Sequence, residues 1–88
     1  MKGDEAMAAT WQEISSWFDE GAELGATHMI VVCDTFEYDD YPVFVEPGKT
    51  ARDVAGEYRG NMQRVMECYD LRMDKDTQMC EYRALHWD

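Results

Sequence analysis

The first third of the chain carries apolar residues at every third or fourth position, with acidic residues between them. This spacing is the period of an amphipathic helix, so we expect residues 11–24 to form one. Thr10 and Glu13 make a capping-box pair at its start, and Gly25 follows its last turn as a left-handed terminator. The expected helix therefore has an apolar face for the core and an acidic face for solvent or a partner.

Two short segments rich in β-branched residues come next. The first, THMIVVC at 27–33, is apolar at odd and even positions alike, which is typical of a strand that is covered on both sides or central in a sheet. The second, YPVFVE at 41–46, contains Pro42, which cannot donate to a strand ladder and so favours a sheet edge. The stretch CDTFEYDDY at 33–41 then becomes a hairpin connection, with its tip near EYDD.

The C-terminal half contains two capping signals and one ambiguous segment. The capping signals predict a short helix over 51–58 and a last helix over 75–86. Residues 62–73 place their apolar side chains at helical spacing, which favours a helix there as well. A third strand over 64–73 is the alternative, because it would give the sheet an independent stability that a lone hairpin lacks.

These elements together predict the α+β class, with an N-terminal helix, a β-hairpin, and two or three C-terminal helices packed over one face of the sheet. The 88 residues suffice for a single small domain, assigned to 10–88, and residues 1–9 are expected to be a flexible tail. With 45% hydrophobic residues the chain is too apolar to be a disordered polyanion. It has no apolar run long enough to span a bilayer and no apolar secretory core at its N-terminus, so we expect a cytoplasmic protein.

The net charge of −11 at pH 7 is concentrated in the N-terminal half. Neither lysine nor arginine occurs between Lys2 and Lys49, whereas the rest of the chain is nearly neutral. Such a field repels nucleic acid and anionic membranes and attracts basic surfaces. The expected partner is therefore a basic protein or nucleoprotein complex, with no direct binding to nucleic acid or to membranes.

The cysteines and acids do not predict a metal centre or a cofactor. The cysteine number is odd and the spacings are wide, which indicates reduced thiols. Structural zinc sites use paired ligands such as C-x-x-C, which are absent from this sequence, and the acids of 34–40 miss the ligand positions of an EF-hand. Cys33 is expected to be a buried strand residue, because its acidic neighbours would raise its thiol pKa. A small enzyme or metal protein built on His28, Cys33 and Asp34 remains an alternative.

The acidic helix face and the acidic hairpin are consecutive in sequence, so we expect them to be neighbours in space. Glu13 and Glu20 would lie about 10.5 Å apart along the helix axis, near the rise of three nucleotides at ~3.4 Å each, so carboxylates could substitute for phosphates in a basic groove. The aromatic residues of the hairpin would supply the anchors that protein interfaces favour. The predicted partner-binding residues are Glu13, Asp19, Glu20, Glu23, Asp34, Phe36, Glu37, Tyr38, Asp39, Asp40 and Tyr41.

Two segments carry a resemblance to known proteins. GATHMIVVCDTFEYDDYPVFV at 25–45 and NMQRVMECYDL at 61–71 resemble a family of small uncharacterised bacterial and phage proteins. This resemblance covers most of the chain and implies no activity and no site residues. By type, a small acidic chain without a cofactor also resembles phage-encoded inhibitors of host defence, anti-CRISPR proteins among them, several of which imitate nucleic acid with carboxylates. The near-neutral segment 49–88 would confine such imitation to one side.

The sequence therefore predicts a non-enzymatic acidic binding protein. It would dock on a basic, nucleic-acid-binding partner such as a host defence effector and inhibit it by carboxylate mimicry of phosphates. Two alternatives stay open. One is the enzyme or metal protein described above. The other is a structural subunit of a homo-oligomer or larger particle, whose methionine and tryptophan side chains form an apolar interface.

Overall fold

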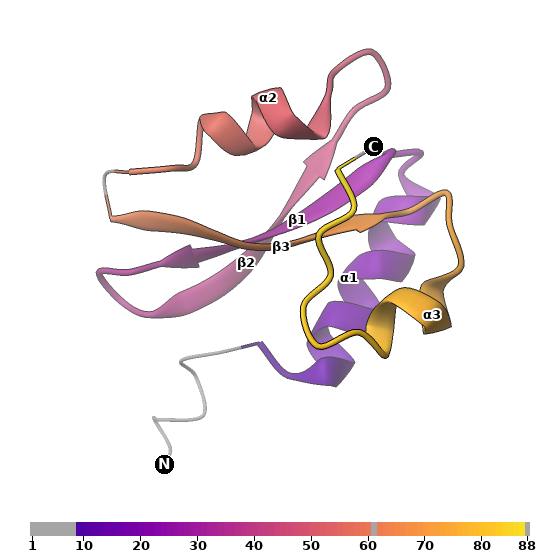
Figure 1. The fold of residues 1–88 in the computed structure, drawn as a ribbon, viewed down its shortest axis with the longest axis horizontal. Coiled ribbons are helices and arrows are strands. Elements are labelled where there is room, and N and C mark those ends of the chain that lie inside the picture. The colour runs from indigo at the N-terminus through magenta and orange to yellow at the C-terminus, as the bar shows by residue number, and fades with distance from the viewer. Residues whose placement is uncertain (1–8, 61, 88) are drawn as a thin grey trace.

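The structure is a computed structural model that describes residues 9–60 and 62–87. Its elements follow one another along the chain as in Figure 1, and their mixture confirms the predicted α+β class. In order they are α1 Trp11–Glu23, β1 His28–Asp34, β2 Asp39–Val45, α2 Ala51–Gly56, β3 Gln63–Asp70 and α3 Lys75–Met79. The tail expected over 1–9 lies, except for Ala9, outside the described residues.

Helix α1 begins and ends where its flanking residues predict. The Thr10 hydroxyl accepts a hydrogen bond from the Glu13 amide at 3.1 Å, and the Glu13 carboxylate accepts one from the Thr10 amide at 2.9 Å. This reciprocal pair is the capping box. At the other end Gly25 has a φ of 82°, and the amides of Gly25 and Ala26 donate to carbonyls of the last turn. The helix therefore ends in a Schellman motif, which needs a left-handed residue at that point.

Strand β1 is the centre of an antiparallel sheet with the order β2-β1-β3. Met29 and Val31 belong to the core on one face of the sheet, and Ile30 and Val32 belong to the core on the other. Because both faces are covered, every position of the strand can be apolar. The prediction of a strand covered on both sides is confirmed. Pro42 lies on the edge strand β2, as expected.

Helices cover both faces of the sheet, so the expectation that they pack over one face is wrong. On the α1 face, Phe18 of α1 and Met79 of α3 share a core with Met29. On the opposite side, the α2 face, Val54 packs in a core with Ile30. Figure 1 shows the sheet between α2 and the other two helices. The physical reason is that both faces of β1 are apolar, and each must be removed from water.

Strand β3 occupies the segment for which helical spacing favoured a helix, so that prediction is wrong and the third-strand alternative is confirmed. A β-bulge explains the difference. The pairing of β3 with β1 shifts by one residue, which leaves Met66 as an extra residue on β3. As a result Val65 packs in the α2-face core, whereas Met66 and Tyr69 both pack in the α1-face core. The bulge interrupts the alternation by which a strand is normally recognised.

Helix α3 ends at Met79, so the prediction of a last helix to residue 86 is wrong beyond that residue. The chain runs beside the outer edge of β3 instead. The Cys68 amide donates to the Ala84 carbonyl and the His86 amide donates to the Cys68 carbonyl, both at 2.9 Å. Backbone pairing of this kind covers part of an edge that would otherwise expose unpaired amides and carbonyls.

Gln78 joins α3 to β3 from a fully buried position. Its side-chain oxygen accepts from the Asp70 amide at 2.8 Å, and its side-chain nitrogen donates to the carbonyls of Asp70 and Asp74 at 2.8 and 3.1 Å. A buried amide side chain must find such partners, because an unsatisfied polar group would destabilise the fold. Gln78 therefore fixes the place of α3 against the end of β3.

Helix α2 confirms the short helix expected over 51–58, although it ends two residues earlier. The Thr50 hydroxyl accepts from the Asp53 amide at 3.2 Å and so caps its first turn. Ala51 and Val54 turn their side chains into the α2-face core.

Candidate interaction surface

The hairpin between β1 and β2 is shaped by Asp34. Its carboxylate accepts hydrogen bonds from the amides of Phe36 at 2.9 Å and Glu37 at 3.4 Å. An aspartate can build such a turn because its short side chain reaches the amide two residues further on. Of the predicted partner-binding residues, Asp34 thus holds the turn that carries Phe36, Glu37 and Tyr38.

Three exposed apolar side chains gather at the hairpin end of the sheet. Phe36 and Tyr38 belong to the turn and are 69% and 53% exposed, and Met62, just before β3, is 60% exposed. The Thr35 amide donates to the Met62 carbonyl at 2.8 Å, which holds the two segments together. We refer to Phe36, Tyr38 and Met62 as the tip patch. Large apolar side chains that cluster in solvent mark interaction surfaces more often than single scattered ones.

Two residues of the tip patch adopt the left-handed backbone conformation. The φ angles are 60° at Tyr38 and 66° at Met62. Bulky L-residues rarely adopt this region, which costs them about 1–2 kcal/mol each. A turn selected for stability alone would carry glycine or asparagine at such positions. Strain of this kind is concentrated at functional segments, where the side chain matters more than the backbone energy.

Two exposed carboxylates are sequence neighbours of Phe36 and Tyr38 in the tip patch, and Arg64 shares the same end of the sheet. Glu37 and Asp39 are exposed, and Asp39 pairs with Asp34 across the hairpin. Arg64 is exposed on β3, where it pairs with Cys33 of β1. The tip patch is therefore an apolar centre with a mainly acidic rim, and this layout resembles that of protein interfaces.

The carboxylates of α1 are spread along the molecule instead of joining the hairpin. Helix α1 runs back along the sheet, so its C-terminal end lies at the start of β1 and the hairpin lies at the other end (Figure 1). Glu20 and Glu23 are exposed near the C-terminal end of α1, away from the hairpin. The Asp19 carboxylate is paired with Lys75 at 2.8 Å. The expectation that the acidic helix face adjoins the hairpin is wrong for Glu20 and Glu23, because a seven-residue strand separates the two ends of the sheet by about 20 Å.

Asp40 and Tyr41, the last two predicted residues, turn towards the body of the domain. Tyr41 is half-buried against the α2-face core, and its hydroxyl accepts from the side-chain nitrogen of Gln63 at 2.7 Å. The Asp40 carboxylate accepts from the Ala9 amide at 3.0 Å. Neither side chain belongs to the tip patch, and Asp40 instead lines a pocket.

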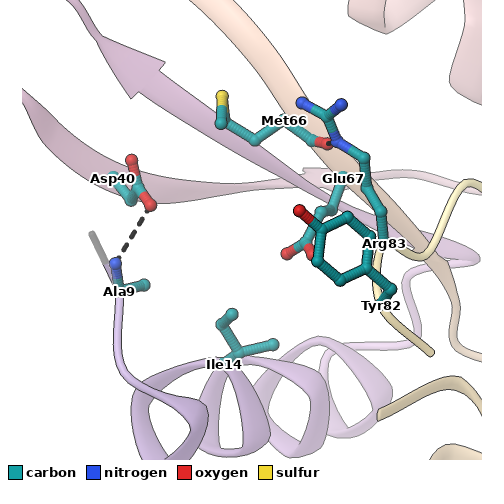
Figure 2. A pocket seen from close by; sticks show the side chains of 7 residues that line it. All are labelled: Ala9, Ile14, Asp40, Met66, Glu67, Tyr82 and Arg83. Carbon is teal, nitrogen blue, oxygen red and sulfur yellow. Dashed lines mark hydrogen bonds between the residues drawn. The ribbon is translucent and has the colours of Figure 1, made fainter. Parts of the chain in front are cut away.

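This pocket, which we call the α1-face pocket, has a volume of about 420 Å³ (Figure 2). Its size is within the range of small-molecule sites, roughly 300–1,000 Å³. The start of α1, strand β2, the bulged part of β3 and the chain after α3 all contribute to its walls. The lining residues are Ala9, Ile14, Asp40, Met66, Glu67, Tyr82 and Arg83.

Glu67 supplies the second carboxylate of the pocket. Burial raises the pKa of Glu67, and the nearby Asp40 carboxylate adds to this, whereas a hydrogen bond from the Tyr69 hydroxyl at 3.2 Å and the charge of Arg83 oppose it. Burial and the Glu67 charge in turn raise the pKa of Tyr69, so its hydroxyl stays protonated and donates. Figure 2 shows the Glu67 and Asp40 carboxylates on opposite sides of the pocket, with Ile14 below them.

The alternative site of His28, Cys33 and Asp34 is not assembled. His28 begins β1 and Asp34 ends it, so about 20 Å separates them. His28 instead lies beside Asp70, with 3.7 Å between Nε2 and Oδ2. Cys33 is buried, as predicted. Its burial and its hydrogen bond to the Asp40 carboxylate raise the pKa of its thiol, which is the opposite of what a nucleophile requires.

Within residues 9–60 and 62–87, no three His, Cys, Asp or Glu side chains are grouped so as to hold a metal ion. Cys33, Cys68 and Cys80 are free thiols, the first two buried and the third exposed. In the same part of the chain, no helix combines the length and apolar character needed to cross a membrane.

The chain was compared with known protein families, curated proteins and solved structures. No match was found. The resemblance to small bacterial and phage proteins therefore stays a prediction.

Sequence reasoning missed Met62, Glu67 and Tyr82. The place of Met62 beside the hairpin depends on the pairing of β3 with β1, which local spacing did not reveal. Glu67 carried a usable signal, because a strand over 64–73 puts this acid within an otherwise apolar face. Tyr82 lies beyond the end of α3, and no local pattern indicated that it borders a pocket.

Proposed function

We propose that this protein is a non-enzymatic binding protein that docks through the tip patch onto a basic surface of a partner. One observation carries the proposal. Exposed apolar side chains, left-handed backbone and an acidic rim coincide at one end of the sheet. Exposed apolar patches generally reduce solubility and strained backbone generally reduces stability, so neither is expected unless a partner uses them.

The tip patch is suited to the role of anchor. Aromatic side chains are enriched among the residues that contribute most to protein binding. Phe36 and Tyr38 project from a turn that the Asp34 carboxylate already holds in place. A preformed turn loses less conformational entropy on binding than a mobile loop would. Docking would therefore bury two aromatic rings with little rearrangement of the hairpin.

Charge indicates the class of partner. The net charge of −11 and the carboxylates of Glu37 and Asp39 beside the anchors favour a surface rich in lysine and arginine. A nucleic-acid-binding protein offers such a surface, and occupation of its groove by carboxylates would inhibit it. A host defence effector, as for phage anti-CRISPR proteins, is the partner class that we favour. Glu13 and Glu20 on the exposed side of α1 would form a second, separate acidic row.

The cytoplasm is the compartment proposed, because free thiols stay reduced there.

The test is affinity capture from bacterial lysate with two matched variants. Phe36→Ser removes an exposed aromatic ring of the tip patch, and Leu24→Ser removes an equally exposed apolar side chain, 67% accessible, just after α1. Wild type and Leu24→Ser are expected to retain the same protein, identified by mass spectrometry, and Phe36→Ser is expected to retain at least about tenfold less, as loss of an anchor of 1.4 kcal/mol or more implies.

Raised salt should release the captured protein, because screening weakens contacts between exposed charges. Thermal unfolding of both variants would first establish that they fold. Equal capture by wild type and Phe36→Ser, or an equal loss with Leu24→Ser, would show that the tip patch is not the docking surface.

A further inference from the structure

We propose that the α1-face pocket receives an arginine side chain presented by the basic partner. This inference rests on the docking function proposed above and deepens it, because it names the group that the protein recognises.

The polar lining of the pocket suits a guanidinium group. Asp40 and Glu67 approach the pocket from opposite sides, from β2 and from the bulge of β3 (Figure 2). A guanidinium carries five donors in a planar fork and can therefore bridge two separate carboxylates. Burial disfavours the charge of Glu67, so a cation placed beside it would stabilise the ionised carboxylate.

The apolar lining suits the stem of the same side chain. Ile14 and Met66 contribute hydrocarbon surface to the lining. Arginine carries three methylene groups below its charged head and buries them along apolar surface when the head finds partners. A small inorganic cation would leave this apolar surface unused.

Tyr82 provides the third element of recognition. Its side chain lines the pocket and is nevertheless fully exposed, at 101%. An exposed aromatic ring beside two carboxylates is free to stack on a cation, and guanidinium groups stack on such rings more often than ammonium groups do. Tyr82 would then close over the occupant and lose its exposure.

Arg83, the basic residue of the pocket lining, does not act as the cation between Asp40 and Glu67. The Arg83 Nε donates to the Met66 carbonyl at 3.1 Å, which holds the guanidinium at the rim (Figure 2). The lining therefore has two carboxylates and one guanidinium, so it would attract an additional cation. Arg83 opposes the rise in the Glu67 pKa, but burial has the larger effect.

The position of the pocket connects it with the tip patch. Asp40 follows directly after the exposed Asp39 of the hairpin, on the strand that begins there. A partner surface seated on the tip patch would lie close enough to extend one long side chain over Asp40 into the pocket. The tip patch would supply apolar contact, and the pocket would select for arginine.

The experiment titrates the isolated protein with a capped arginine, Nα-acetyl-arginine methylamide, and follows backbone amide shifts by NMR. Saturable shifts are expected around Ile14, Asp40, Glu67 and Tyr82, with a dissociation constant on the order of a few millimolar, as befits one side chain. The matched control ligand is the capped citrulline, which has nearly the same shape and no charge, and it should bind at least about tenfold more weakly.

Three variants test the residues involved. The double variant Asp40→Asn, Glu67→Gln should weaken binding of the capped arginine about tenfold or more. The double variant Glu46→Gln, Glu57→Gln makes the same change in net charge on exposed residues outside the pocket and should leave binding unchanged within twofold. Tyr82→Ala removes a fully exposed ring, so it cannot disturb the core, and should weaken binding severalfold.

Several results would overturn the inference. They are equal binding of capped citrulline, an equal loss in both double variants, or no saturable shifts around the pocket. Because this titration uses neither a partner nor the tip patch, its failure would leave the docking function standing. Equal capture by the Phe36→Ser variant would refute the proposed docking surface, but it would not change the interpretation of the arginine titration.

Discussion

The left-handed backbone at Tyr38 predicts an inverted preference between alanine and glycine. The variants Tyr38→Ala and Tyr38→Gly delete the same side-chain contacts, so the difference between them isolates the backbone. At a φ of 60° an alanine costs about 1–2 kcal/mol through its Cβ atom. Glycine loses roughly 0.5–1 kcal/mol more conformational entropy on folding. The glycine variant should therefore be the more stable by about 0.5–1 kcal/mol, which corresponds to about 2–8 °C in Tm for a domain of this size.

Urea and thermal unfolding followed by circular dichroism would measure this difference. The control pair is Glu37→Ala and Glu37→Gly, at the preceding exposed position of the same turn, where φ is not positive. There alanine should be at least as stable as glycine. If alanine at position 38 equalled or exceeded glycine, the left-handed conformation would carry no strain, and the argument that the tip patch is retained for function would lose its main support.

Three further predictions concern the body of the domain. Gln78→Leu removes the acceptor of the buried Asp70 amide and should lower the free energy of unfolding by about 1–3 kcal/mol in urea titrations, whereas an unchanged midpoint would contradict the role of Gln78. A thiol reagent at pH 8 should modify exposed Cys80 at once and the buried cysteines only after denaturation, since burial also raises the pKa of Cys68 to about 12. Burial raises the Glu67 pKa above the 4.5 of an unperturbed side chain, so the folded state binds the proton more tightly and stability falls as pH rises through the raised pKa. Glu67→Gln should therefore be more stable than the wild type at pH 7, by under about 1 kcal/mol because the group is half-exposed. This gain should disappear below pH 4, and a gain that persists in acid would refute the argument.

Features that depend on neighbours in sequence were predictable. The capping box of Thr10 and Glu13 and the terminator Gly25 fixed both ends of α1, because each acts within a few residues. The apolar character of both faces of β1 identified a strand that is covered on two sides. The same observation implies that helices must lie on both faces of the sheet. The prediction nevertheless placed them on one face.

Features that depend on distant partners were not predictable from spacing. Residues 63–70 satisfy a helical stripe as well as a bulged strand, and the free edge of β1 decides between them. Pairing along that edge supplies long-range hydrogen bonds that a local helix cannot match, so tertiary context overrides the local pattern. Because of the bulge at Met66, both Met66 and Glu67 line the α1-face pocket. A residue inserted into a strand has no distinct sequence pattern by which it could be predicted.

In the proposed docking, the tip patch and the α1-face pocket would divide the requirements of selective binding between them. Burial of Phe36 and Tyr38 would contribute affinity that depends little on salt or on the identity of the opposite surface, since apolar contact is non-directional. Asp40 and Glu67 would contribute less affinity, because the desolvation of charges offsets much of their attraction, but they would reject surfaces that cannot supply a cation. An apolar patch alone would bind indiscriminately and carboxylates alone would bind weakly. The hairpin connects the two surfaces, because it carries Phe36 and Tyr38 of the tip patch and because Asp40, which follows it on β2, lines the α1-face pocket.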